Sequence, residues 1–289
     1  MARSGDAVRL GCAAISRRLG LPATCLAAAF LLSCSAGEPL QPLNPGSEFA
    51  ADVAAVSSKR VYFGHQSVGG NVLAGLDDLQ RSIKGPVIRV GEIGATYEQD
   101  ESGILLHTAI GKNEDPESKC EDFRSVLNRL QGQIDVALFK FCYIDFSDQS
   151  DVDEVFATYS RTMDDMKQQY PDVTLIHVTA PLRTVDRGPG VWVREMLGRP
   201  NRQKIANVKR NEFNRLVRER YAADSIFDLA AIMSTYPDGR RETFTWGDQV
   251  YYSLVPGYTY DGGHLNEVGR SYAAAGLVRS IAAATQSTG

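Results

Sequence analysis

An aspartate and a histidine stand three residues apart near the end of the chain. Asp261 and His264 lie in the sequence DGGHLNEVG, directly before a segment of helical character. On a turn, this spacing lets the carboxylate reach Nδ1 of the imidazole, which fixes the tautomer so that Nε2 can act as a base. The pair therefore predicts half of a hydrolytic site. A surface turn with a capping Asp261 and a solvated His264 is the alternative for this pattern alone.

A serine suited to be a nucleophile stands near the other end of the chain. The predicted strand 60–63 runs into the sequence GHQSVGGN, which places Ser67 at the step from strand to helix. There its hydroxyl is exposed, and backbone N–H groups and the positive end of a helix dipole lie beside any charge that develops. We therefore predict that Ser67 is the nucleophile. A serine that merely caps the helix is the alternative.

Together, the serine after the first strand and the Asp-x-x-His before the last helix resemble the SGNH or GDSL hydrolase family, in element order over the whole domain. The resemblance implies a flavodoxin-like, three-layer α/β/α sandwich and esterase or lipase activity. It implies that Ser67 is the nucleophile, His264 the general base and Asp261 its orienting partner. It also implies an oxyanion hole built from the Ser67 amide and a glycine after the second strand. Gly94, in GEIGAT, matches that glycine, and an ordinary turn glycine is the alternative.

Two motifs of the family are altered in this chain. Gly-Asp-Ser reads GHQS, and an ungapped match puts Gln66 on the nucleophile position; Ser67 stays the prediction because glutamine cannot attack an ester. Gly-x-Asn-Asp reads CYID, so Asp145 matches its last residue and the asparagine that donates to the oxyanion is missing. Loss of one such donor costs about 2.7–4 kcal/mol of transition-state stabilisation. Gln66, Asn71 and Tyr143 are three candidates to replace it, among which the sequence does not choose.

The segments that must position these residues alternate between short apolar runs and stretches of helical period, which predicts an α/β domain with a mostly parallel sheet. We expect five strands, at residues 60–63, 87–90, 134–141, 173–178 and 225–229. Long connections follow strands at residues 91–121, 180–200 and 230–261. They should therefore gather at the carboxyl edge of the sheet, where open α/β folds bind ligands.

The first 50 residues have the character of an export signal and a tether. Residues 1–34 combine four arginines with an apolar run too short to span a bilayer, and they end in LLSC, which resembles a bacterial lipobox with Cys34 as the lipidated residue. An ordinary signal peptide is the alternative, and the paired arginines leave Sec and twin-arginine export open. Residues 35–50 are rich in proline and glycine and predict a tether. We thus expect an exported lipoprotein of the bacterial cell envelope, facing the periplasm or the surface and held to the membrane by its lipid alone, with a hydrolase domain at 51–289.

Composition excludes several other classes of protein. The 289 residues are 43% hydrophobic and 23% charged, which is usual for a globular protein, and the net charge of −4 disfavours nucleic acid as a partner. Cys120 and Cys142 could form a disulfide or stay buried thiols. His107 stands in a polar stretch without recognisable metal-ligand spacing, and His177 fits a core strand, so no metal and no cofactor is expected.

The sequence therefore predicts a serine esterase that cleaves a carboxylic ester through an acyl-enzyme. Its substrate would be a small-molecule or glycan ester, and a carbohydrate O-acyl ester fits the predicted compartment and the aromatic residues of the long connections. An O-acyltransferase would use the same residues with a sugar in place of water. A glycan-binding envelope protein on the same scaffold, without catalysis, is the alternative from another class.

Overall fold

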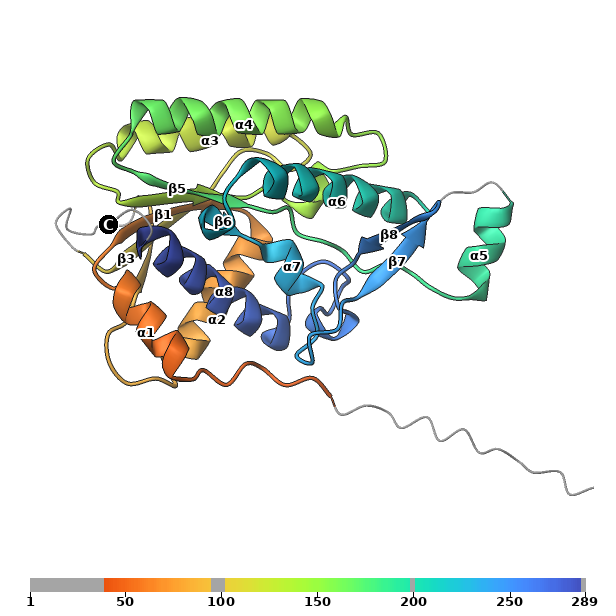
Figure 1. The fold of residues 1–289 in the computed structure, drawn as a ribbon, viewed down its shortest axis with the longest axis horizontal. Coiled ribbons are helices and arrows are strands. Elements are labelled where there is room, and N and C mark those ends of the chain that lie inside the picture. Colours follow the sequence, from red (N-terminus) through yellow and green to blue (C-terminus); the bar gives the residue numbers. More distant parts are fainter. Residues whose placement is uncertain (1–38, 95–101, 198–200, 287–289) are drawn as a thin grey trace, which may run out of the picture. The chain divides into compact units, whose positions relative to one another are not determined.

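The core of the protein is a six-stranded sheet in which every pair of neighbouring strands is parallel. The structure is a computed structural model, and it describes residues 39–94, 102–197 and 201–286 (Figure 1). The strand order is β2-β3-β1-β4-β5-β6. The strands are β1 (Arg60–His65), β2 (Arg89–Glu92), β3 (Ile104–Ala109), β4 (Val136–Phe139), β5 (Thr174–Val178) and β6 (Ile226–Phe227). The predicted class, an α/β sandwich with a mostly parallel sheet, is confirmed.

The predicted count of five strands is wrong, because β3 lies inside the stretch expected to be a long connection. It inserts between β1 and β2 and pairs in register with both, with Leu105 opposite Val61 and Val90. Leu105 is fully buried, so this short apolar run belongs to the centre of the sheet. A run of this length carries no periodicity that separates a buried strand from a loop, although Gly103 and Gly111 bound it as turn residues do.

Helices cover both faces of the sheet and bury a hydrophobic core on each side (Figure 1). On one face lie α1 (Ser47–Val56), α2 (Ser67–Gln80), α7 (Leu229–Met233) and α8 (Glu267–Gln286). On the other lie α3 (Pro116–Arg129), α4 (Val152–Gln169) and α6 (Arg202–Arg220). Helices α2 and α8 pack directly on each other, and a side chain at Gly75 would come within 2.3 Å of the Arg270 carbonyl oxygen. This close approach brings the start of α2 near the loop before α8.

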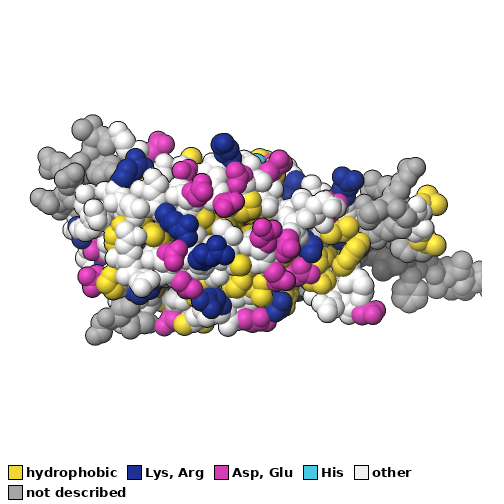
Figure 2. Space-filling view, turned by 90° about the horizontal axis from the view of Figure 1, so that it is seen from above, with side chains coloured by type: hydrophobic (Ala, Val, Ile, Leu, Met, Phe, Trp, Pro, Cys, Tyr) yellow, Lys and Arg dark blue, Asp and Glu magenta, His cyan; other side chains and the backbone are white. Residues whose placement is uncertain are grey.

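The outer face of α3, α4 and α6 has the character of a solvated surface. Figure 2 shows basic and acidic side chains interspersed over it, with small hydrophobic areas between them. Several of these charges pair between helices, as in Arg124–Asp165 at 2.9 Å and Arg220–Asp164 at 2.6 Å. Exposed pairs of this kind contribute little to stability, typically below about 1 kcal/mol each. Nothing on this face concentrates one sign of charge.

The two remaining predicted connections contain short elements of their own. The stretch 180–200 holds α5 (Pro189–Met196), and the stretch 230–261 holds an antiparallel hairpin of β7 (Thr243–Trp246) and β8 (Gln249–Tyr252). Three 3-10 turns complete the described elements: η1 (Tyr143–Asp145), η2 (Ala223–Ser225) and η3 (Pro256–Tyr258). Of these, η1 follows β4 and η3 precedes the loop with Asp261 and His264, so both lie where the predicted site residues are.

The compact domain begins at Pro39. The described part of the predicted tether lies against it, because the Leu43 amide donates to the Ser271 hydroxyl at 2.8 Å and α1 packs on α8. The predicted signal segment and Cys34 lie outside the described residues. Within the described residues, no helix combines the length and the apolar character needed to cross a bilayer. Cys120 and Cys142 are both buried free thiols, so the structure contains the second of the two alternatives given for them.

Candidate active site

Ser67 is the first residue of α2 and follows β1 after a single extended residue, Gln66. The Gln66 carbonyl accepts hydrogen bonds from the Gly69 and Gly70 amides, at 2.8 and 3.2 Å, which closes the first turn of the helix. A Cβ atom at Gly69 would lie 2.3 Å from the His65 side chain, so glycine is required where the helix crosses the strand end. The turn leaves Ser67 exposed, with its own amide at the positive end of the helix.

The Asp261 carboxylate takes part in three hydrogen bonds within this loop, two of them with His264. One carboxylate oxygen of Asp261 accepts from the Gly263 and His264 amides at 2.9 and 2.8 Å, and the other lies 2.5 Å from His264 Nδ1. Gly262, with φ of +83°, makes this tight turn possible. Desolvation raises the pKa of Asp261, but the hydrogen bonds from the His264 ring and from the two amides outweigh it and hold that pKa well below its usual range. Asp261 is thus an anion that holds a proton on Nδ1.

The structure brings Ser67 to this pair. Its Oγ lies 2.9 Å from Nε2 of His264, across 197 residues of sequence. With Nδ1 donating to Asp261, Nε2 carries a lone pair and accepts from the serine hydroxyl. Hydroxyl, imidazole and carboxylate therefore form one continuous line of hydrogen bonds, which can move a proton from Ser67 to His264.

Asn71 connects the helix that carries Ser67 to the loop that carries His264. It lies one turn after Ser67 on α2, and its side-chain oxygen accepts from the Leu265 amide at 3.1 Å. That amide follows His264 directly, so the contact fixes the height of the imidazole above the start of α2. The structure thus shows Asn71 in a positioning contact, and its predicted role as an oxyanion donor stays a prediction.

Tyr143 is the candidate donor that lies beside the reacting atoms. Its hydroxyl is 3.3 Å from Nε2 of His264, and the two rings meet edge to face at 5.6 Å. Burial raises the pKa of Tyr143, so at neutral pH the hydroxyl keeps its proton and can donate. Sequence reasoning named this residue together with two others, and its distance from His264 separates it from them.

The other two predicted donors are placed differently. The Gln66 side-chain amide donates to the carbonyls of Ile110 and Gly111, at 2.8 and 3.1 Å, and so joins the end of β1 to the end of β3. Gly94 follows β2, and β3 separates that strand from β1. Two strand spacings amount to about 10 Å. The role of Gly94 as an oxyanion donor stays a prediction.

The sequence pointed to His65 as a neighbour of Ser67, but it did not predict that His65 pairs with His107. His65 Nδ1 lies 2.8 Å from the Gln66 carbonyl, and His65 Nε2 lies 3.2 Å from His107 Nδ1. Burial lowers the pKa of His65 to about 4, so its ring is neutral near pH 7, donates through Nδ1 and accepts through Nε2. His107 belongs to β3 and is half-buried, which replaces the predicted position in a polar loop. Because the sequence did not predict β3, it did not predict the register that pairs His107 with Phe63.

A second unpredicted group of charges lies buried behind Tyr143. Lys119 Nζ is 2.6 Å from both carboxylate oxygens of Asp145, and both side chains are fully buried. Asp145 also accepts from the Cys142 amide at 2.6 Å and thereby closes the turn that presents Tyr143. Lys140, likewise fully buried, donates to the Phe141 carbonyl at 3.2 Å, and its burial lowers its pKa. The match of Asp145 to the last residue of a family motif was the one signal in the sequence for this cluster.

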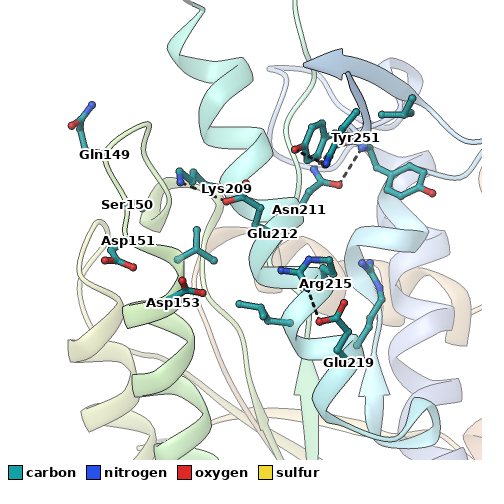
Figure 3. Close-up of a pocket in the computed structure, with 16 residues that line it drawn as sticks. Gln149, Ser150, Asp151, Asp153, Lys209, Asn211, Glu212, Arg215, Glu219 and Tyr251 are labelled. Atoms are coloured by element: carbon teal, nitrogen blue, oxygen red, sulfur yellow. Dashed lines mark hydrogen bonds and ion pairs between the residues drawn. The ribbon is translucent and has the colours of Figure 1, made fainter. Parts of the chain in front are cut away.

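Two further regions take no part in this arrangement. His177 stacks on Tyr221 inside the protein, as expected for a core histidine. A hollow of about 1070 Å³ lies between the start of α4, α6 and β8, and none of Ser67, Tyr143, Asp261 or His264 lines it (Figure 3). Some of its charges pair with one another, as in Arg215–Glu219 at 2.6 Å and Lys209–Glu212 at 3.5 Å. Within residues 39–94, 102–197 and 201–286, no group of three or more His, Cys, Asp or Glu side chains could hold a metal ion.

Comparisons with known proteins give similarity at the level of solved structures. No family model matches the chain, and no curated protein matches it. A protein from Streptococcus pneumonia, provisionally named as a platelet activating factor, is 14% identical with a TM-score of 0.40, over 80% of this chain and 88% of its own. A protein from Desulfitobacterium hafniense DCB-2, provisionally named as a lipolytic protein of the G-D-S-L family, is 10% identical with a TM-score of 0.41, over 77% of this chain and 99% of its own.

Proposed function

We propose that this protein is a serine hydrolase that cleaves carboxylic esters through an acyl-enzyme. The observation that carries the proposal is the line of hydrogen bonds from Ser67 through His264 to Asp261, with contacts of 2.9 and 2.5 Å. An exposed serine at a helix start needs no base to be stable, and a binding protein needs no imidazole aimed at it. The alignment is what acyl transfer requires.

The reaction follows from the geometry in two halves. Ser67 Oγ bonds to the ester carbonyl carbon as its proton passes to Nε2 of His264, and the carbonyl electrons move to oxygen. The Ser67 amide at the start of α2 faces that negative charge. When the tetrahedral intermediate collapses, the alcohol leaves with the proton from Nε2. Water then enters, gives its proton to Nε2 and releases the acid, and Ser67 regains its proton.

Hydrolysis of p-nitrophenyl acetate by the full-length chain tests this proposal. We expect the wild type to release p-nitrophenol, and Ser67→Ala and His264→Ala each to abolish the release above background. Ser58→Ala is a matched control because it removes another exposed serine hydroxyl, which bonds to the Ala55 carbonyl at the end of α1. A folded wild type without activity on activated esters, or activity that survives Ser67→Ala, would contradict the proposal.

We further propose a carbohydrate O-acyl ester as the substrate class. Tyr260 is 70% exposed and lies nearly parallel to the His264 ring, at 6.2 Å, which offers an aromatic face beside the reacting atoms. A hollow of about 530 Å³ borders the same loop, and its lining includes Arg187, Tyr236, Glu242 and Tyr260. Aromatic faces with polar neighbours suit a sugar ring. An acyltransferase would show itself as transfer of the acetyl group to an added sugar at the expense of hydrolysis.

We propose, from the sequence, that the chain is exported and anchored to the cell envelope by a lipid on Cys34. The arginine-rich start, the short apolar run and the LLSC sequence support this. Expression of the full chain in a bacterial host with a labelled fatty acid tests it. We expect label in the wild type and none in Cys34→Ala, and an unlabelled wild type in the cytoplasmic fraction would refute it.

A further inference from the structure

The chain lacks the asparagine that the resemblance to the SGNH family implies as a side-chain donor to the oxyanion. We propose that the hydroxyl of Tyr143 takes that place and donates to the oxyanion during acylation and deacylation. This inference rests on the proposed function, since it concerns the same serine chemistry. Its basis is the position of the hydroxyl, 3.3 Å from the imidazole nitrogen that lies 2.9 Å from Ser67 Oγ.

Proton movement in the reaction frees this hydroxyl for the substrate. At rest, the single lone pair on Nε2 is taken by the Ser67 hydroxyl at 2.9 Å, and the Tyr143 hydroxyl has the longer contact. Once Ser67 gives up its proton, Nε2 carries N–H and can accept from neither. The Tyr143 hydroxyl must then turn to another acceptor. The acceptor that forms at that moment, one bond from the carbon attached to Ser67, is the oxyanion.

Tyr143 is held in place on several sides, as an oxyanion donor must be. Its backbone carbonyl accepts from the buried guanidinium of Arg210 at 2.8 Å. The Cys142 amide before it is held by Asp145 at 2.6 Å. A Cβ atom at Gly263 would lie 2.9 Å from the phenol ring, so the catalytic loop packs directly on that ring. The hydroxyl therefore needs little reorganisation when charge appears.

Arg183 supplies a positive charge behind the phenol. Its guanidinium lies 5.0 Å from the centre of the Tyr143 ring. It donates to the carbonyls of Gly262 and Asp261, at 3.3 and 3.4 Å. A cation at this distance makes the phenol a stronger donor, and it stabilises negative charge in front of the ring.

The rate of reaction of Ser67 with a fluorophosphonate, measured from pH 5 to 10 on the full-length chain, tests this inference. The phosphonyl oxygen takes the position of the ester oxyanion. Tyr143→Phe keeps the ring and removes the donor, so we expect the plateau rate to fall at least tenfold, toward the 10²–10³-fold known for loss of one oxyanion donor. Tyr251→Phe is the matched control, because it removes a phenol hydroxyl that bonds to Gln249 on β8 at 3.1 Å, in the hollow that none of Ser67, Tyr143, Asp261 or His264 lines, and it should stay within twofold of the wild type.

The level of the plateau separates the outcomes. A plateau unchanged in Tyr143→Phe, whether or not its pH midpoint moves, would overturn the inference and leave Tyr143 at most a partner of His264. A wild type without label on Ser67 would instead refute the proposed function itself. If Tyr143→Phe does not fold, the protein with 3-fluorotyrosine at position 143 is measured in its place. The fluorine makes the hydroxyl more acidic, so the alkaline fall in rate should begin at a lower pH than in the wild type. An unchanged alkaline limit would overturn the inference.

Discussion

Two polar groups of side chains lie near the carboxyl edge of the sheet, and they differ in their exposure to solvent. The exposed triad is Ser67, His264 and Asp261, and its histidine and aspartate side chains are 27% and 41% exposed. The buried cluster is Lys119, Asp145 and Lys140, all fully or nearly fully buried. In the triad a proton can move along the line of hydrogen bonds and out to substrate. In the cluster, Asp145 is surrounded by donors and is fixed.

The two groups have separate roles at the same edge of the sheet: the triad suits catalysis, and the buried cluster suits structural support. Buried charges are costly to separate but rigid when paired, so the cluster suits the task of holding the Cys142–Tyr143 turn. A half-exposed imidazole is less rigid but can exchange protons. The division predicts that changes in the triad affect activity and leave stability nearly unchanged, and that changes in the cluster affect stability first.

The largest effect is expected from the triad. Ser67→Ala and His264→Ala should each lower kcat by about 10⁶-fold, and Asp261→Asn by about 10⁴-fold because it disturbs the tautomer of His264. The free energy of unfolding in urea should change by less than about 0.5 kcal/mol for Ser67→Ala, since its side chain is exposed. A large loss of stability in Ser67→Ala would contradict the expected separation of roles, in which the triad serves activity and the buried cluster serves stability.

The next effect concerns the buried cluster. Asp145→Leu leaves Lys119 buried without its partner and should lower the free energy of unfolding by about 3–5 kcal/mol. The double variant Lys119→Met with Asp145→Leu is the control, because it removes both charges, and it should regain most of that loss in urea unfolding. If the double variant is as unstable as the single one, lost packing and not an unpaired charge explains the effect.

Acid should destabilise the protein through two buried histidines. Burial lowers the pKa of His65 to about 4 and that of His177 to about 3, both below the value near 6.5 of an unfolded chain. Between pH 6.5 and 4 the unfolded state therefore binds more protons, so stability is complete above pH 6.5 and declines as the pH falls, by about 3 kcal/mol for each histidine. Urea unfolding across this window measures the slope.

The matched variant for the acid effect is His177→Gln, which lies in the core away from the triad. It should remove about half of the slope between pH 6.5 and 4, since His65 stays in place. Activity at pH 7.5 should stay within twofold of the wild type. An unchanged slope would mean that His177 can take up a proton without loss of the fold, against its contact with Tyr221.

The smallest expected effect is on substrate binding. Tyr260→Ala removes the exposed ring that lies parallel to His264. For acetylated sugars we expect KM to rise about five- to tenfold, which corresponds to about 1–1.4 kcal/mol, with kcat nearly unchanged. For p-nitrophenyl acetate, which has no sugar to stack, both constants should stay within twofold. Equal losses on the two substrates would argue against a sugar site at Tyr260.

Much of the site could be predicted because its residues stand at the ends of regular elements. The strand-to-helix step at Ser67 and the turn between Asp261 and His264 each leave a local pattern in the sequence. Parallel strands then bring such ends to one edge, which is why two motifs 197 residues apart meet at 2.9 Å.

What the sequence could not give depends on packing between distant segments. The strand β3 has no periodicity of its own, so the sequence did not predict it. Without β3, neither the pairing of His65 with His107 nor the position of β3 beside β1 could be predicted. The choice among Gln66, Asn71 and Tyr143 is likewise set by contacts: Gln66 with the end of β3, Asn71 with Leu265, and Tyr143 with His264. The local sequence around these residues contains no pattern from which those contacts could be predicted.

The most direct test of the central claim is the identity of the residue that a fluorophosphonate modifies. The full-length protein is incubated with the reagent near pH 7.5, and its peptides are mapped by mass spectrometry. We expect one adduct, on Ser67, which disappears in His264→Ala although the serine is still present. An adduct on another serine, or a folded protein that stays unmodified, would contradict the claim that His264 activates Ser67.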